Sequence, residues 1–194
     1  MKYLLALLCC FSFPALAGDW QLHSNRDGVE VFTAEVSGQN LKAFRGIAVL
    51  DAPMDKVLNV LADLPRMPRW FYQMRSAQLL SGNESQGRVY IVIAGIWPVS
   101  DRDAVIDVET DNINDAVMIQ SVGRPAAKPI ESCCVRIPSL QSSWLVSSLG
   151  PTQTQVIFTT QSHPGGIIPL WLANRVAVDM PRQTLNGLRR EVVQ

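Results

Sequence analysis

The stretch HPGGIIPLWLAN, residues 163 to 174, marks where the last element of the fold begins. It holds two glycines and two prolines, followed by an apolar run without an acid or a base. From about Ile168 to Val193, apolar residues recur at helical spacing, at Leu172, Val176, Met180, Leu185, Leu188 and Val192. Pro181 lies inside this run and removes one helical hydrogen bond, which predicts a kink near Asp179. The sequence therefore predicts a long, kinked C-terminal helix.

The chain ahead of this helix has the character of strands from Arg88 onward. Six segments fit a strand pattern: 89–96, 104–109, 116–122, 133–137, 143–149 and 155–161. Turn-rich pieces such as TDNIND and SLGPTQT separate them. Strands in series with short connections favour an antiparallel meander over alternating βαβ units. The predicted fold class is therefore α+β.

The first part of the domain predicts a hairpin, a strand and a short helix. Residues 20–23 and 29–36 flank the turn sequence NRDG, and residues 41–50 form another strand pattern. In DAPMDKVLNVLAD, residues 51 to 63, apolar residues repeat at helical spacing and Asp51 is positioned to cap the first turn. Leu64-Pro65 ends this helix, because proline disfavours helical geometry in the residue before it. No repeat or linker divides the chain.

The N-terminal residues MKYLLALLCCFSFPALA have the layout of a secretory signal peptide. Lys2 precedes an apolar core, and Ala15-Leu16-Ala17 is a small-x-small cleavage motif. A permanent membrane anchor would need about 20 apolar residues, but this run breaks at Pro14. A lipoprotein is not favoured, because no small residue directly precedes Cys9. We expect cleavage after Ala17, a single domain over residues 18–194, and a periplasmic or secreted protein.

Composition argues against several functions. Lys and Arg total 17, as do Asp and Glu, so the balanced charge gives no electrostatic footprint for nucleic acid. With only two histidines, His23 and His163, spacing predicts no metal site. GxSxG, a phosphate-binding glycine loop and the dinucleotide fingerprint are absent. We therefore predict no catalytic residue and no cofactor, although a dispersed triad leaves no spacing signature.

Cys133 and Cys134 are adjacent cysteines in a chain that we expect to be exported. An oxidising compartment makes pairing an option. Neighbouring residues of a strand, however, point to opposite faces, so a bridge between them would need a strained peptide. We therefore expect two free thiols.

The run PVSDRDAVIDVE, residues 98 to 109, raises the question of a buried arginine. In a strand, Ala104, Ile106 and Val108 share an inward face, and the acids share the outward one. Alternation places Arg102 on the apolar face, where a guanidinium is costly unless something pairs with it. Either a bend returns Arg102 to the surface, or it reaches into a ligand cavity. Arg136, in CCVRIP, leaves the same two alternatives open.

Aromatic residues are spread along the whole chain. The larger ones are Trp70, Phe71, Trp97, Trp144, Phe158 and Trp171. Their distribution fits a single apolar volume that they line together. A solid core is the alternative.

Three segments together resemble a StAR-related lipid-transfer (START) domain: WPVSDRDAV, VRIPSLQSSWLVSSLGPTQTQVIFTT and HPGGIIPLWLAN. The resemblance extends from Trp20 through the proline-containing C-terminal helix. It implies a helix-grip fold, in which a curved antiparallel sheet wraps around the long helix and encloses an internal apolar cavity for one lipid.

The resemblance also gives the opening stretch a role. Residues 163–166 would form a tight turn, with Pro169 near the start of a helix that acts as a lid. His163 replaces the Asp that is common in the family. Sterol-carrying relatives have an acid in the strand before the Arg-Asp run, but residues 89–96 contain none. The signal peptide suggests a bacterial envelope version.

The resulting expectation is a monomeric protein that binds, and possibly transfers, one lipid or fatty acyl compound through transient contact with a membrane surface. Arg102 and Arg136 would contact a polar head group. The walls and lid would come from Trp144, Phe158, Trp171, Leu172, Val176 and Met180. Motion of the helix and of residues 65–74 would admit the ligand. The alternatives are a cyclase- or hydrolase-like enzyme of the same superfamily, and a filled core with an interaction role.

Overall fold

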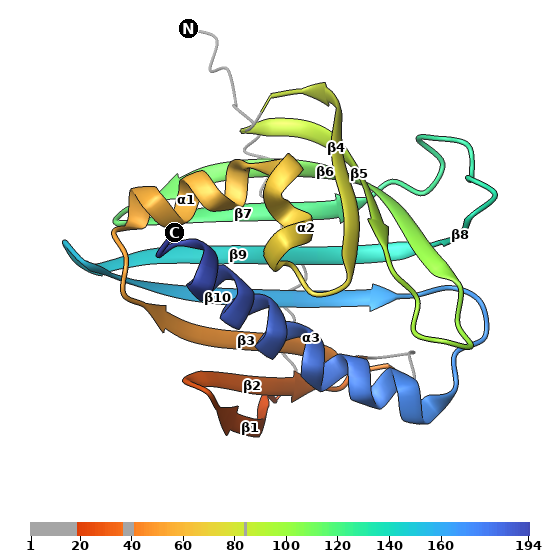
Figure 1. The fold of residues 1–194 in the computed structure, drawn as a ribbon, viewed down its shortest axis with the longest axis horizontal. Coiled ribbons are helices and arrows are strands. Elements are labelled where there is room, and N and C mark those ends of the chain that lie inside the picture. The colour runs from red at the N-terminus through yellow and green to blue at the C-terminus, as the bar shows by residue number, and fades with distance from the viewer. Residues whose placement is uncertain (1–18, 37–40, 84) are drawn as a thin grey trace, which may run out of the picture.

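The computed structural model describes residues 19–36, 41–83 and 85–194, without the side chains of residues 170, 171, 173, 174 and 177. Ten strands form one sheet in the order β1-β2-β3-β10-β9-β7-β6-β5-β4, with β8 beside β6 (Figure 1). Their bounds are β1 Gln21–Arg26, β2 Val29–Ala34, β3 Ala43–Leu50, β4 Met74–Gly82, β5 Gln86–Ile93, β6 Asp101–Ile113, β7 Ala116–Gly123, β8 Cys134–Arg136, β9 Ser139–Gly150 and β10 Gln153–His163.

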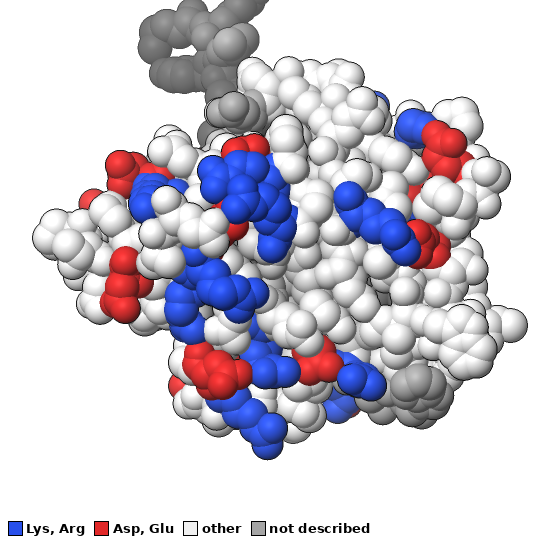
Figure 2. All heavy atoms as spheres, in the orientation of Figure 1, with Lys and Arg blue, Asp and Glu red and all other residues white. Residues whose placement is uncertain are grey.

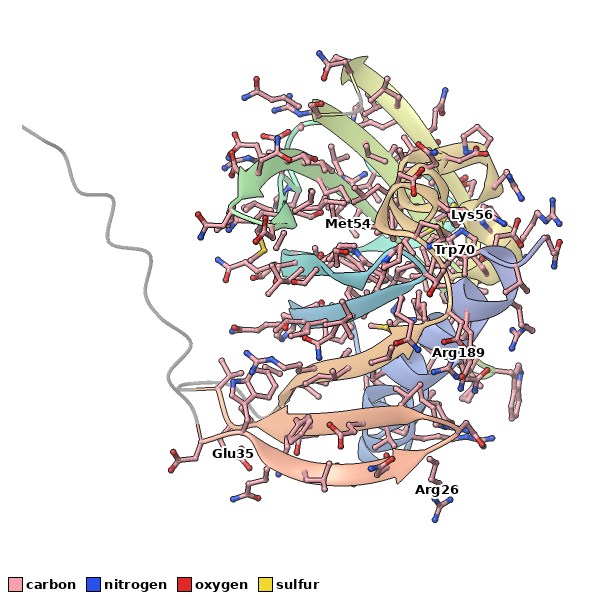
Figure 3. The ribbon with its side chains drawn as sticks, turned by 90° about the vertical axis from the view of Figure 1, so that its left-hand side faces the viewer. Arg26, Glu35, Met54, Lys56, Trp70 and Arg189 are labelled. Atoms are coloured by element: carbon pink, nitrogen blue, oxygen red, sulfur yellow. A yellow bond between two sulfur atoms is a disulfide. The ribbon has the colours of Figure 1, made fainter. Side chains whose placement is uncertain are left out.

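The helices all lie on one face of this sheet (Figures 1 and 3). They are α1 (Met54–Ala62), a 3-10 turn η1 (Leu64–Arg66), α2 (Met67–Trp70) and α3 (Leu170–Glu191). The long helix α3 crosses the face diagonally and contains Pro181. Curved antiparallel strands around a C-terminal helix make the helix-grip arrangement, so the predicted α+β class is confirmed.

The inward side chains of the sheet change in character along the strands. One cross-strand row consists of small aliphatic residues that are all buried: Val117, Val146, Val156, Ala48 and Val29. The next row contains Ile119, Trp144, Phe158, Gly46 and Val31. The C-terminal half of α3 and its C-cap residue pack over these rows through Leu185, Leu188 and Val192. The solid core therefore occupies one end of the sheet.

Two glycines allow α3 to approach its neighbours closely. A Cβ at Gly46 of β3 would lie 2.7 Å from Leu185 Cδ1 and 3.1 Å from Pro181 Cβ. A Cβ at Gly187 would lie only 2.0 Å from the carbonyl oxygen of Trp70, at the end of α2. The C-terminal half of α3 is thus held against both the sheet and α2.

Some local expectations were wrong. Strand β4 was not predicted at all; it lies at the edge of the sheet, and most of its side chains are exposed. Asp51 does not cap α1: the N-cap is Pro53, and Asp51 Oδ1 accepts a hydrogen bond from Gln153 Nε2 at 2.9 Å. Strand β8 pairs with β6 in parallel, so the sheet is not a pure antiparallel meander.

Cys133 and Cys134 form a disulfide, so the expectation of free thiols is also wrong. Only Cys134 belongs to β8, whereas Cys133 lies in the turn before it. The argument from strand alternation does not apply to a residue in a turn.

The predicted signal peptide, residues 1–17, lies outside the described residues. Among the residues that are described, no helix combines the length and apolar character needed to cross a bilayer.

Gly187→Ala provides a test of the close packing of α3. Helix propensity alone would make alanine more stabilising than glycine by about 1 kcal/mol. We expect the opposite sign, a loss of about 1–3 kcal/mol, because the added methyl group meets the Trp70 carbonyl. Urea unfolding followed by circular dichroism measures the difference. A more stable variant would show that α2 and α3 are not in close contact.

Candidate functional site

A cavity of about 850 Å³ lies between the sheet and the helices. This volume is within the range of small-molecule sites, about 300–1,000 Å³. Most of the residues that line it are apolar, and no aspartate or glutamate is among the described lining residues. The interior is therefore hollow, and the alternative of a filled core is wrong.

Six of the eight residues expected to bind a ligand line this cavity: Arg102, Trp144, Phe158, Leu172, Val176 and Met180. The side chain of Trp171 lies outside the described residues. Arg136 is not a lining residue. The structure thus brings together the predicted walls, the predicted lid and one of the two arginines.

An aromatic cluster closes the cavity on the side of the solid core. Trp144 of β9 and Phe158 of β10 are stacked, with ring centroids 4.1 Å apart. Trp70 and Phe71 meet these rings edge-on, at centroid distances between 5.9 and 6.4 Å. Trp70 lies between the helices and the sheet (Figure 3). Such offset and edge-on pairs add about 0.5–1.5 kcal/mol beyond burial, so this end of the cavity is well fixed.

The two halves of α3 contact different parts of the protein. Leu172, Val176 and Met180 in the N-terminal half face the cavity, whereas Leu185 and Leu188 in the C-terminal half belong to the core. A spacing of four residues keeps the first three on one side of the helix. The N-terminal half therefore forms the roof of the hollow region.

Arg102 is buried and reaches the cavity, so the alternative of a bend that returns it to the surface is wrong. Its side chain is 7% exposed. Nη1 donates to the carbonyl of Ser100, and Nη2 donates to the carbonyl of Gly165 at 3.3 Å. Nε has no partner, and no described carboxylate forms a salt bridge with the guanidinium. Burial lowers the pKa of Arg102. A cation without a counterion therefore faces an apolar space.

Arg136 is also buried, but on the outer face of the sheet. Its Nε and Nη2 each donate to an oxygen of Asp103 at 2.9 Å. The remaining N–H groups donate to the backbone carbonyls of Pro125, Lys128 and Pro129. All five donors are thus used within the protein, which is why Arg136 does not reach the cavity.

Asp103 corrects the expectation that the acids of β6 point to solvent. It is 0% exposed, because segment 124–137 folds over the outer face of this strand. Burial alone would raise the pKa of Asp103, but hydrogen bonds from Arg136 and Tyr90 outweigh it and lower the pKa. Burial and the bond to Asp103 raise the pKa of Tyr90 to about 12. The three groups form a neutral, satisfied network.

Two loops, residues 94–100 and residues 164–169, border the Arg102 end of the cavity and lie side by side in Figure 1. The loop of residues 94–100, AGIWPVS, carries no charge, and the surface over it is uncharged in Figure 2. Its Trp97 is 88% exposed, and Ile167, in the segment before α3, is 95% exposed. Arg102 joins the two loops through the carbonyls of Ser100 and Gly165.

The predicted turn at residues 163–166 is present. Gly165 and Gly166 have φ values of 68° and 62°, which glycine adopts without strain. His163 Nδ1 accepts a hydrogen bond from the N–H of Gly165 at 3.2 Å. The histidine therefore caps this turn in the way that a carboxylate would.

Sequence reasoning missed a set of hydroxyl groups on the cavity wall. Ser121, Ser142 and Thr160 line the cavity from three neighbouring strands. The available signal was alternation, because Ser142 and Thr160 share the inward faces of their strands with Trp144 and Phe158.

No group of three potential metal ligands occurs among the described residues.

The START domain profile matches residues 16–190. The chain belongs to the START domain family. An uncharacterised protein of Pseudomonas aeruginosa is 35% identical over 176 residues, covering 90% of this chain and 87% of that protein. The phosphatidylcholine transfer protein of Mus musculus is 27% identical, with 87% of each chain covered.

A solved START structure has the same fold. The STAR-related lipid transfer protein of Xanthomonas axonopodis superposes with a TM-score of 0.83 at 31% identity, covering 90% of this chain and 99% of that one. The family that the sequence motifs suggested is thus confirmed.

Asp103→Asn tests the buried network, because it leaves the Arg136 guanidinium buried without its counterion. We expect a loss of about 3–5 kcal/mol in the free energy of unfolding at pH 7. The folded-state pKa of Asp103 is lowered, so its contribution is present above the unfolded pKa of about 3.9 and is lost as pH falls through the lower folded value.

The measurement is urea unfolding between pH 3 and pH 7. The wild type should lose stability below about pH 4, and the variant should lose less over the same interval. Asp111→Asn, at an exposed position of the same strand, is the matched control. Equal stability of the two variants at pH 7 would contradict the role assigned to Asp103.

Proposed function

We propose that this protein binds one anionic lipid in its cavity and transfers it between membranes. The observation that carries the proposal is Arg102, a buried cation without a carboxylate partner at one end of an apolar cavity. Membership of the START family supports lipid binding, and so does the similarity to phosphatidylcholine transfer protein.

The apolar walls supply most of the affinity. Burial of an acyl chain contributes roughly 0.8 kcal/mol per CH₂ group. A chain of ten carbons therefore offers several kcal/mol, from which the costs of immobilisation and of opening the roof are subtracted. The aromatic cluster and the inner side of α3 present the apolar surface that such a chain requires.

Arg102 selects for a negative charge. A guanidinium stays protonated at any physiological pH. That of Arg102 makes only two hydrogen bonds, one from Nη1 and one from Nη2, so each of these nitrogens keeps an N–H for a carboxylate or phosphate oxygen. Charge-assisted hydrogen bonds are roughly twice as strong as neutral ones. The anionic group of the lipid therefore lies at the Arg102 end, with the chain extending toward the aromatic cluster.

The same end is suited to contact a membrane. Trp97 and Ile167 expose large apolar side chains on two uncharged loops. Tryptophan is enriched at membrane interfaces, because its ring is amphipathic. Contact there would bring the cavity entrance to the bilayer, with the N-terminal half of α3 and residues 65–74 moving to admit the lipid.

Binding is favoured over catalysis in this cavity. A cyclase or hydrolase needs a positioned acid or base with a perturbed pKa. No described aspartate, glutamate or cysteine lines the cavity, and Asp103 is bonded by Tyr90 and Arg136 on the outer face of β6. Tyr72 lines the cavity, but burial raises its pKa and makes it a weaker acid. We propose that the predicted signal peptide exports the protein to the periplasm or out of the cell, and that the protein acts as a monomer.

Native mass spectrometry of protein purified from its own cell envelope tests the function. We expect one anionic lipid per wild-type chain. Arg102→Met should lose that lipid, since the guanidinium that pairs with it is gone. The variant should be at least as stable as the wild type, because a buried charge without a counterion has been removed.

Two ligands of equal chain length sharpen this test. Arg102→Met should weaken binding of stearate by about tenfold or more, because a charge-assisted bond contributes about 1.5–3 kcal/mol. Binding of octadecanol, which has no charge, should change little. Wild-type protein that carries no lipid and binds neither compound would overturn the proposed function.

Trp97→Ser combined with Ile167→Ser tests the membrane contact. We expect slower transfer of a fluorescent fatty acid between vesicles, with unchanged affinity in solution, because neither side chain lines the cavity. Leu149→Ser, which removes an exposed apolar residue at the end of β9, is the control. Equal transfer rates for wild type and double variant would place the membrane contact elsewhere.

A further inference from the structure

Three hydroxyl-bearing residues form a continuous row across the cavity wall. Ser121 of β7 stands directly opposite Ser142 of β9, and Ser142 stands directly opposite Thr160 of β10. All three line the cavity. Ser121 is 7% exposed and Thr160 is 4% exposed. We call these three residues the hydroxyl row; Val108 and Phe44 flank it on the adjoining strands.

The hydroxyl row has no hydrogen-bond partner among the described residues, although its members are close enough to bond one another. Directly opposed side chains have Cβ atoms about 4.5–5.5 Å apart. Two other buried threonines do have partners: Thr154, on the same face of β10, donates to the carbonyl of Ala52 at 2.8 Å. Thr184 accepts from the N–H of Tyr72.

The hydroxyls of the row face the cavity, and a hydroxyl beside apolar surface costs free energy unless a polar atom bonds it there. Alanine and valine would fill the same positions without that cost. Three adjacent hydroxyls that all face the cavity are therefore expected to meet polar atoms there.

The row lies between the two ends of the cavity already described. On one side, the next inward residues along β9 and β10 are Trp144 and Phe158 of the aromatic cluster. On the other side, β10 leads to Gly165, whose carbonyl accepts from Arg102. Thr160 and Gly165 are five residues apart, a span of at most about 18 Å. A single extended molecule can therefore contact both Arg102 and the row.

We infer that the hydroxyl row is a second polar subsite, which donates hydrogen bonds to an uncharged oxygen of the ligand. The inference rests on the proposed function and specifies its ligand: an anionic lipid that also carries an ester carbonyl or a hydroxyl group along the part that enters the cavity. Serine and threonine hydroxyls donate and accept without a charge, so they match such an oxygen. A plain fatty acid leaves the row unpaired.

The experiment compares stearate with hydroxystearates that bear the hydroxyl group at carbons 5 to 12, and with 1-stearoyl lysophosphatidic acid as the ester probe. Affinities come from displacement of a fluorescent fatty acid. The wild type should bind at least one oxygenated probe about tenfold more tightly than stearate, as expected for one to two added hydrogen bonds.

Ser142→Ala combined with Thr160→Val should reduce this preference to about twofold or less, while stearate affinity changes little. Ser143→Ala is the matched control, because Ser143 follows Ser142 in β9 and points to the opposite face. The single variant Ser142→Ala gives the same comparison if the double variant is unstable in thermal unfolding, and it should lose part of the preference.

The outcomes distinguish a failure of the second subsite from a failure of the proposed function. If the wild type binds stearate but prefers no oxygenated probe, or if the double variant keeps the preference, the second subsite is overturned and the proposed function stands. If the double variant gains affinity for every probe alike, the row binds water only, and the inference also fails. If the wild type binds none of the probes, the proposed function and the inference fall together.

Discussion

The seating of α3 on the sheet is the constraint on which the rest of this structure depends. Gly46 and Gly187 let Pro181, Leu185 and the backbone of α3 come within contact distance of β3 and α2. That contact fixes only the C-terminal half of the helix. The N-terminal half consequently spans a space that the sheet does not fill, so one helix both completes the core and covers the cavity.

Arg102 and Arg136 lie on the neighbouring strands β6 and β8, but their side chains have different surroundings. Arg136 meets Asp103 on the outer face of β6, where segment 124–137 supplies the remaining acceptors. Arg102, one residue from Asp103, points to the inner face and meets only two carbonyls. The first pair holds a loop in place. Arg102 has no counterion, which lowers the stability of the protein, and an anionic ligand would offset that loss.

Most of the fold could be predicted, because periodicity reports burial. The stripe from Leu172 to Val192 located α3, and alternation placed Arg102 on the inner face. Strand β4 was not predicted, because an exposed edge strand needs no apolar alternation. The surroundings of Arg136 and the hydroxyl row were not predicted, for a different reason. Whether a side chain has a partner, as Arg136 has Asp103, depends on which distant segments fold together. Spacing along the chain does not encode that.

The link that Arg102 makes between the two loops has a thermodynamic consequence. The guanidinium that holds the carbonyls of Ser100 and Gly165 is also the proposed anchor of the ligand. On the proposed function, occupancy of the cavity and rigidity of these two loops would be coupled, and coupling free energies are reciprocal. A membrane surface that loosened these loops would then lower the affinity for the lipid, and arrival at an acceptor bilayer would itself promote its release.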